Sequence, residues 1–336
     1  MKKSLLALAV FGAFAGAASA QTNVTIYGLV DAGIRRTDSD INGKAWELAS
    51  GMQSGSRLGF KGTEDLGGGL SAIFALENGF TVDNGGLDQG GRLFGRQAWV
   101  GLNGGFGTVK LGRQYTPIFT VLDSLDPFST GIIGGDAGAL AVFETYGIRM
   151  DNTINYSMPN VGGFSGQVAY GFGEVAGRFS DARNMGASVG YANGPLNVAA
   201  AYHRQDRLAT SSDPTTEGKT WLVGATYDLG VVKGHVAYAD NRGEAATSTR
   251  SRDGMIGVSV PVGGVGTVLA SYTRHDDREG SADASFWGVG YTHSLSKRTN
   301  LYTSYSRVNN DAGSNRGFVT AGDDVNWFNV GIRHIF

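Results

Sequence analysis

The feature that most constrains this chain is an alternation of apolar and polar side chains that recurs, with a period of two, in sixteen short segments. In the segment 24–35, Val24 and Ile26 fall on one side, and Thr25 and Asp31 fall on the other. A period of two with one apolar side is the pattern of a half-buried β-strand. The sequence therefore predicts an all-β chain of sixteen strands, an even number that suits an antiparallel barrel.

Two further regularities distinguish a membrane barrel from a soluble sandwich, in which alternation also occurs. The turns between segments alternate between short and long, as they do at the two rims of a barrel. The apolar side often ends in an aromatic residue, as an interfacial girdle requires. These residues are Tyr156, Tyr170, Tyr191, Tyr202, Tyr227, Tyr238, Tyr272, Tyr291, Tyr305 and Phe336. Because hydrocarbon tolerates no open sheet edge, we expect a closed transmembrane barrel whose lumen is too wide for side chains to fill.

One long interval, 115–152, lacks the alternation. It exceeds the roughly 12–15 residues beyond which a connection usually has a function or is disordered. It combines apolar side chains that need burial with four carboxylates. The apolar residues are Ile118, Phe119, Val121, Leu122, Phe128, Ile132 and Ile133, and the acids are Asp123, Asp126, Asp136 and Glu144. We expect this interval to fold into the water-filled lumen and to narrow it.

The first twenty residues predict a secretory signal peptide. Lys2 and Lys3 precede a short apolar run, and the small residues Ala18 and Ala20 indicate cleavage before Gln21. The expected domains are therefore the signal peptide, 1–20, and one exported barrel domain, 21–336. The chain has no cysteine, which excludes disulfides and thiol metal sites. Its formal net charge of −2 gives no reason to expect a nucleic-acid partner.

Several stretches resemble the general diffusion porins of Gram-negative outer membranes, most closely the beta-proteobacterial type. They are VTIYGLVDAGI, SRLGFKGTEDLGGGLSAIFALE, FGRQAWVGL, FGTVKLGRQ and the closing VGIRHIF, in order along the chain. The resemblance implies a homotrimer of sixteen-stranded barrels in the outer membrane, in contact with lipid and lipopolysaccharide. It implies that the third extracellular loop enters each pore. It also implies that Phe336 is the signal read by the barrel-assembly machinery.

The resemblance further implies a pore constriction in which arginines on the barrel wall face acids on the inward loop. The matching wall residues are Arg57, Arg96 and Arg149, and the alternation places Arg57 and Arg149 on the polar side. The candidate loop acids are Asp123, Asp126, Asp136 and Glu144. Arg113 shares the apolar side of its segment, and we expect it to point outward into the subunit interface.

Gly134, Gly135 and Asp136 resemble the Gly-Gly-Asp of the porin constriction loop. The enterobacterial pattern has carboxylates four and eight residues before that aspartate, but this chain has Ile132 and Phe128 there. The arginines remain while the opposing acids are fewer. We therefore expect passive passage of ions and small hydrophilic solutes, with a preference for anions set by a transverse field.

Three alternatives remain at this stage. A substrate-specific porin for small carboxylates or sugars would need lumenal aromatics, and few have the required parity, Tyr27 and Trp327 being examples. A soluble adhesin would be extracted without detergent. An outer-membrane hydrolase would need a nucleophile motif, and none accompanies the five histidines, which are His203, His235, His275, His293 and His334. We therefore expect no catalytic residues, no cofactor and no metal site.

Overall fold

A computed structural model describes residues 23–131, 147–207, 217–244, 249–317 and 319–336. The expected signal peptide, 1–20, lies outside these residues and stays a prediction. No helix within the described ranges is long and apolar enough to span a bilayer. Among the residues that the structure describes, the regular elements are β-strands and one helix, α2, Pro117–Leu125.

The strands follow one another along the chain with short and long connections in turn. Their bounds are β1 (Asn23–Ser39), β2 (Gly43–Ser50), β3 (Arg57–Gly67), β4 (Leu70–Gly79), β5 (Gln97–Gly104), β6 (Gly107–Tyr115), β7 (Arg149–Ser157), β8 (Phe164–Gly171), β9 (Asn184–Asn193), β10 (Leu196–Asp206), β11 (Glu217–Asp228), β12 (Lys233–Glu244), β13 (Thr249–Val262), β14 (Gly266–Asp277), β15 (Ala284–Ser294), β16 (Thr299–Asn310) and β17 (Val325–Ile335).

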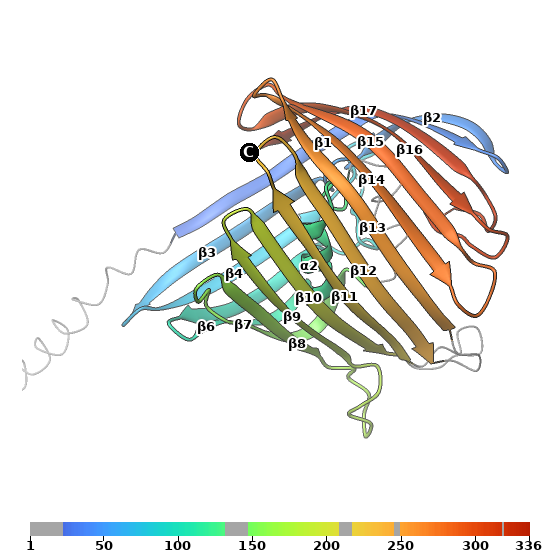
Figure 1. Cartoon of the computed structure of the whole chain (residues 1–336). Coiled ribbons are helices and arrows are strands. Elements are labelled where there is room, and N and C mark those ends of the chain that lie inside the picture. The colour runs from blue at the N-terminus through green and yellow to red at the C-terminus, as the bar shows by residue number, and fades with distance from the viewer. Residues whose placement is uncertain (1–22, 132–146, 208–216, 245–248, 318) are drawn as a thin grey trace, which may run out of the picture.

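The sheet closes on itself where the first and last strands meet. β1 pairs antiparallel with β17, from Leu29 opposite Ile335 to Ser39 opposite Val325. The other edge of β1 pairs with β3 along its first half and with β2 along its second half. β2 and β3 therefore occupy one position, interrupted at 51–56, and the predicted closed barrel of sixteen antiparallel strand positions is confirmed (Figure 1).

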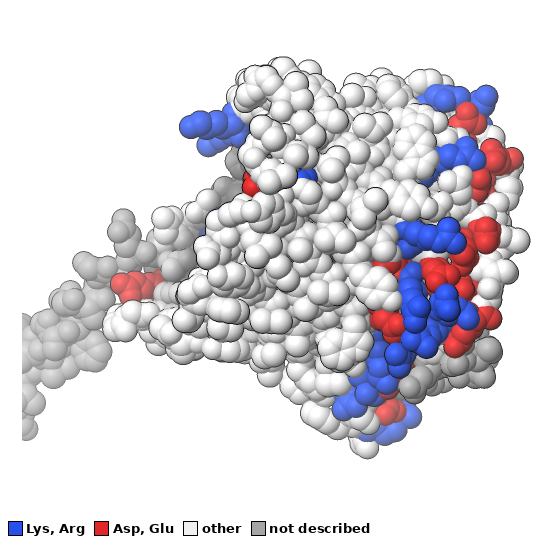
Figure 2. Space-filling model, in the orientation of Figure 1, with Lys and Arg blue, Asp and Glu red and all other residues white. Residues whose placement is uncertain are grey.

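The outer surface carries the apolar side of each strand. Val223, Val236 and Ile256 are exposed on it, whereas their neighbours Leu222 and Ala237 point inward and are buried. Figure 2 shows that this surface is almost free of charge over its middle and that acids and bases gather along one end. That end holds the longer connections, such as those between β4 and β5 and between β8 and β9. This distribution is that of a barrel wall facing lipid, with its charged rim in water.

The helix α2 begins the long connection between β6 and β7. Thr116 caps it by accepting a hydrogen bond from the backbone nitrogen of Phe119 at 3.2 Å, and Pro117 occupies its first turn. Its buried residues recur at helical spacing and pack on inward side chains of β10 to β13. The cluster consists of Ile118, Val121, Leu122, Leu125, Ala199, Ala201, Leu222, Ala237, Ala239 and Met255. The first part of the connection therefore lies against the inner wall (Figure 1).

Candidate functional site

A cavity of about 700 Å³ lies between α2 and the opposite part of the inner wall. The wall contributes Arg57, Arg96 and Arg149. The exposed side of α2 contributes Thr120 and Asp123, and the interrupted strand position adds residues 50–56. We call this region the neck. It brings together the three predicted wall arginines and one of the predicted loop acids.

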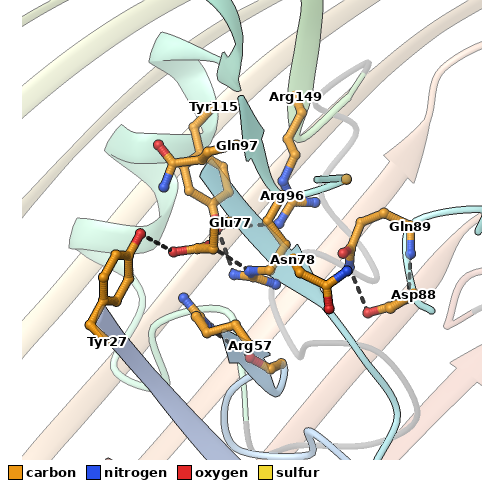
Figure 3. Close-up of polar contacts among 12 residues, drawn as sticks. Tyr27, Arg57, Glu77, Asn78, Asp88, Gln89, Arg96, Gln97, Tyr115 and Arg149 are labelled. Carbon is orange, nitrogen blue, oxygen red and sulfur yellow. Dashed lines mark hydrogen bonds and ion pairs between the residues drawn. The ribbon is translucent and has the colours of Figure 1, made fainter. Parts of the chain in front are cut away.

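Two of the three arginines are held by a buried carboxylate and a tyrosine that the sequence analysis did not single out. Arg96 donates from Nε to Glu77 at 2.7 Å and from Nη2 to the Tyr115 hydroxyl at 2.6 Å. Arg149 also reaches the Tyr115 hydroxyl, at 3.2 Å, and lies over its ring. The second oxygen of Glu77 accepts from the Tyr27 hydroxyl at 2.8 Å. Figure 3 shows these side chains converging from different strands, which fixes the guanidinium groups in place.

Arg57 approaches the same region from the start of β3. Its Nε donates to the carbonyl of Gly55 at 2.9 Å, in the interruption between β2 and β3. Asp123 lies across the cavity on α2 and accepts a hydrogen bond from the Thr130 hydroxyl at 2.9 Å. Burial raises the pKa of Asp123, while the Thr130 hydroxyl and the Arg57 guanidinium oppose that shift.

The side chains that line the neck carry more positive than negative charge. They include four arginines, since Arg35 joins the three above, and two aspartates, Asp88 and Asp123. Glu77 does not line the cavity and is only 3% exposed, so it orients Arg96 without facing a solute directly. A narrow passage with an excess of fixed cations attracts anions.

The other predicted site residues lie in different surroundings. Asp126 is 3% exposed, and its carboxylate accepts from the backbone nitrogens of Phe128 and Thr130, at 3.3 and 2.8 Å. Asp126 is not among the residues that line the cavity. Its carboxylate instead stabilises the turn that follows α2. Asp136 and Glu144 fall in 132–146, outside the described residues.

Arg113 lies near the end of β6, at the register shift between Gly112 and Gln114. It pairs with Ala98, and its Nη1 contacts Asp151 at 2.6 Å. Arg92 contacts the same aspartate at 2.8 Å. At the seam of the barrel, the backbone of Phe336 exchanges hydrogen bonds with Gly28 at 3.0 and 3.2 Å. The last residue therefore helps to close the sheet.

The inner wall also carries aromatic side chains, and a buried histidine contacts an acid. The expectation of few lumenal aromatics was incomplete, because Phe286 and Tyr302 also point inward, although both are buried in a cluster with Phe128. The Nδ1 atom of His275 lies 2.6 Å from Asp253, and its Nε2 atom lies 3.1 Å from Arg316. The contacts of this imidazole ring are thus with an acid and an arginine, and not with the serine that a hydrolase triad would need. Over the part of the chain that the structure describes, no cluster of potential ligands could hold a metal ion.

Comparison with known proteins places these observations in context. A model of the Gram-negative porin family matches residues 6–313. Outer membrane porin protein 32 of Delftia acidovorans is 38% identical, with all of both chains covered. The solved anion-selective porin from Comamonas acidovorans is 33% identical and superposes with a TM-score of 0.84, covering 94% of this chain and 100% of that one. The trimer form of the Vibrio cholerae outer membrane protein OmpT, 17% identical, shares the fold with a TM-score of 0.69 over 94% of this chain and 99% of that one.

Proposed function

The chain belongs to the Gram-negative porin family, and on that basis we propose that its neck favours anions because Arg57, Arg96 and Arg149 form one side of it. The protein is an outer-membrane channel for passive diffusion of ions and small hydrophilic solutes. The observation that carries the proposal is the excess of arginines over aspartates among the side chains that line the cavity. The solved structure named an anion-selective porin, which shares this fold, also supports a preference for anions.

The mechanism is electrostatic and needs no covalent step. The arginines and Asp123 lie on opposite sides of the neck, so a field crosses the path of the solute. A hydrated anion gains attraction from guanidinium groups that are already held in position, and a cation meets their repulsion. Solutes with dipoles can align in the field, whereas apolar solutes would have to displace ordered water. We propose that the protein transports solutes without catalysis. We expect lipid vesicles that contain it to release trapped solutes and not to hydrolyse test esters.

Planar-bilayer recording under a salt gradient tests the ion preference. Arg57→Gln and Arg149→Gln each remove one positive charge from the lining of the neck, and both should move the reversal potential toward zero. Arg178→Gln is the control, because Arg178 is an exposed residue between β8 and β9 that does not line the cavity. A wild-type reversal potential in both neck variants would refute the assignment.

A second candidate function is a pore that binds small carboxylates on their way through. It is favoured by one observation, the pair of arginines that Tyr115 holds side by side at the cavity. The planar guanidinium group matches a carboxylate in two hydrogen bonds. A conductance that saturates with carboxylate concentration would favour this candidate, and a linear dependence would favour the general pore.

We propose that Arg113 belongs to an interface between subunits of a homotrimer. Arg113 on β6, Asp151 on β7 and Arg92, in the connection between β4 and β5, form one charged group. Charges on a lipid-facing wall are costly, by about 2–4 kcal/mol for an arginine at mid-depth. Contact with another subunit would remove that cost. Native mass measurement in detergent tests the assembly, with a trimer expected for the wild type and a smaller trimer fraction for Arg113→Leu.

The proposed lipid and assembly partners have their own supports. On the outer side of β12 and β13, three arginines share one carboxylate, Asp240, with contacts of 3.0, 3.4 and 3.7 Å to Arg242, Arg250 and Arg252. We propose that they bind the phosphates of lipopolysaccharide, and less co-purified lipopolysaccharide is expected for Arg250→Gln combined with Arg252→Gln.

We propose Phe336 as the signal for the barrel-assembly machinery, so its deletion should lower the amount of assembled barrel in cells.

A further inference from the structure

Four glycines on alternate strands of the inner wall lie directly beneath the chain segment that narrows the lumen. They are Gly186 on β9, Gly224 on β11, Gly257 on β13 and Gly290 on β15. A β-carbon built on each would lie 2.8 Å from Pro117 Cδ, 2.5 Å from Leu125 Cδ1, 2.7 Å from Pro127 Cγ and 2.9 Å from Phe128 Cε1, respectively. Carbon atoms in ordinary contact are about 3.5–4.0 Å apart. An added β-carbon would therefore displace the segment or its side chains, and at Gly186 and Gly257 it would meet the rigid ring of a proline. We call these four residues the wall glycines.

The segment 117–128 separates the wall glycines from the cavity. Ile118, Leu122 and Leu125 are fully buried against the wall side chains. Thr120 and Asp123, on the other side of the same helix, line the neck opposite Arg57. Because the helix moves as one body, a shift away from the wall carries its polar side toward the arginines. The distance from wall to helix therefore sets the free width of the neck.

The segment is also held along its length, so that it cannot yield by sliding. The carbonyl of Leu125, at the end of α2, lies 2.8 Å from Nδ1 of His235 on β12. Asp126 fastens the following turn through the backbone of Phe128 and Thr130. Gly131 lies so close to the carbonyl of Gln53 that a β-carbon there would be 2.0 Å from it. A contact added behind the segment is therefore relieved mainly by movement into the lumen.

We propose that the wall glycines set the largest solute that the pore admits, by letting the narrowing segment lie directly on the barrel wall. They are positioning residues, because they act through the segment and do not touch the solute. The inference rests on the channel function but not on its ion preference. The wall glycines, behind the segment, thus determine the largest solute, and the arginines on the other side of the cavity determine the ion preference.

Alanine substitution of Gly257 tests the proposal. The added methyl group would meet the ring of Pro127, and single-channel conductance should fall by roughly a fifth or more as the neck narrows. The exclusion size for uncharged polymers should fall with it. Gly254→Ala on the same strand is the matched control, because a β-carbon at Gly254 meets nothing within 4 Å. Folding is checked by the heat-dependent gel mobility of the barrel.

A second substitution separates narrowing of the neck from general damage. Pro127→Ala removes the ring atoms that the new methyl group meets, so Gly257→Ala with Pro127→Ala should recover the wild-type conductance and exclusion size. Gly290→Ala with Phe128→Leu repeats the design on β15 and decides the question if Gly257→Ala does not fold. A folded Gly257→Ala or Gly290→Ala channel with wild-type exclusion size would overturn the proposal, as would a loss that the second substitution does not restore. The reversal potential separately reports the arginines, so failure of one proposal is distinguishable from failure of the other.

Discussion

At the scale of single residues, the neck depends on a carboxylate that no solute meets. Glu77 lies between Arg96 and Tyr27 and is almost fully buried. The alternation places Arg57 inward, and the resemblance identifies Arg96, so both could be found from the sequence. Glu77 has the same inward parity and could have been noticed. Its partnership with Arg96 follows from the register that sets Glu77 opposite Gln97, which periodicity alone does not give.

Replacing Glu77 by glutamine should make the channel more anion-preferring. The variant keeps an acceptor for Arg96 but removes the negative charge that offsets the guanidinium, so the fixed positive charge at the neck increases. The measurement is the reversal potential under a salt gradient. Glu64→Gln, at the exposed end of β3, makes the same charge change away from the cavity and should behave as the wild type. A shift of the Glu77→Gln potential toward cation preference would contradict the assignment.

At the scale of elements, the strands were predictable and two other pieces were missed. The helix α2 has its apolar residues at helical spacing, at 118, 121, 122 and 125, after a capping threonine and a proline, so its signal was present in the sequence. β2 was missed because the strand position is interrupted before β3. The register shift between Gly112 and Gln114 also takes Arg149 out of the simple alternation of β7. Arg149 nevertheless lines the neck.

The turn after α2 should lose stability as pH rises. Burial raises the pKa of Asp126 to about 6, against two backbone hydrogen bonds that oppose the shift. The folded protein binds the carboxyl proton of Asp126 more tightly than the unfolded chain does. Its contribution to the free energy of unfolding is therefore complete below the usual aspartate pKa. It is lost as pH rises through about 6. The difference between pH 4 and 7 corresponds to about 2–3 kcal/mol.

Urea unfolding in detergent across this pH range measures the effect of Asp126. Asp126→Asn keeps one oxygen acceptor but does not titrate, so its stability should change less with pH than that of the wild type. Asp65→Asn, at the turn between β3 and β4, is the control and should keep the wild-type slope. Identical slopes for wild type and Asp126→Asn would show that Asp126 does not carry the pH dependence.

At the scale of the whole molecule, the closed barrel follows from the period of two and the even count of strand positions. One side of every strand faces lipid and the other faces the lumen, and neighbouring residues therefore have opposite surroundings. This division could be predicted from the sequence, because residues at odd and even positions of a strand point to opposite sides of the sheet. The entry of the long connection into the lumen was expected from its mixture of apolar and acidic side chains, and the resemblance implied the same path. Its contacts with the wall depend on residues far apart in the chain, such as Pro127 and Gly257.

Adjacent substitutions on one strand should differ sharply in cost. Val168 is 54% exposed on the outer side of β8, and Val168→Arg should destabilise the barrel in lipid by about 2–4 kcal/mol. Gln167 is its inward neighbour, and Gln167→Arg should cost much less because its charge stays in lumenal water. Unfolding in lipid vesicles compares them. Equal costs would indicate that the two sides of the strand do not face different media.

The most direct test uses the absence of cysteine from the chain. Single cysteines are introduced at Thr120, on the side of α2 that lines the neck, and at Leu122, on the side buried against the wall. The measurement is single-channel current before and after addition of a negatively charged, water-soluble thiol reagent. The account predicts that the current through Thr120→Cys falls on modification and that the current through Leu122→Cys does not change. Full labelling of Thr120→Cys with no change in current would contradict a pore that passes between α2 and the arginines.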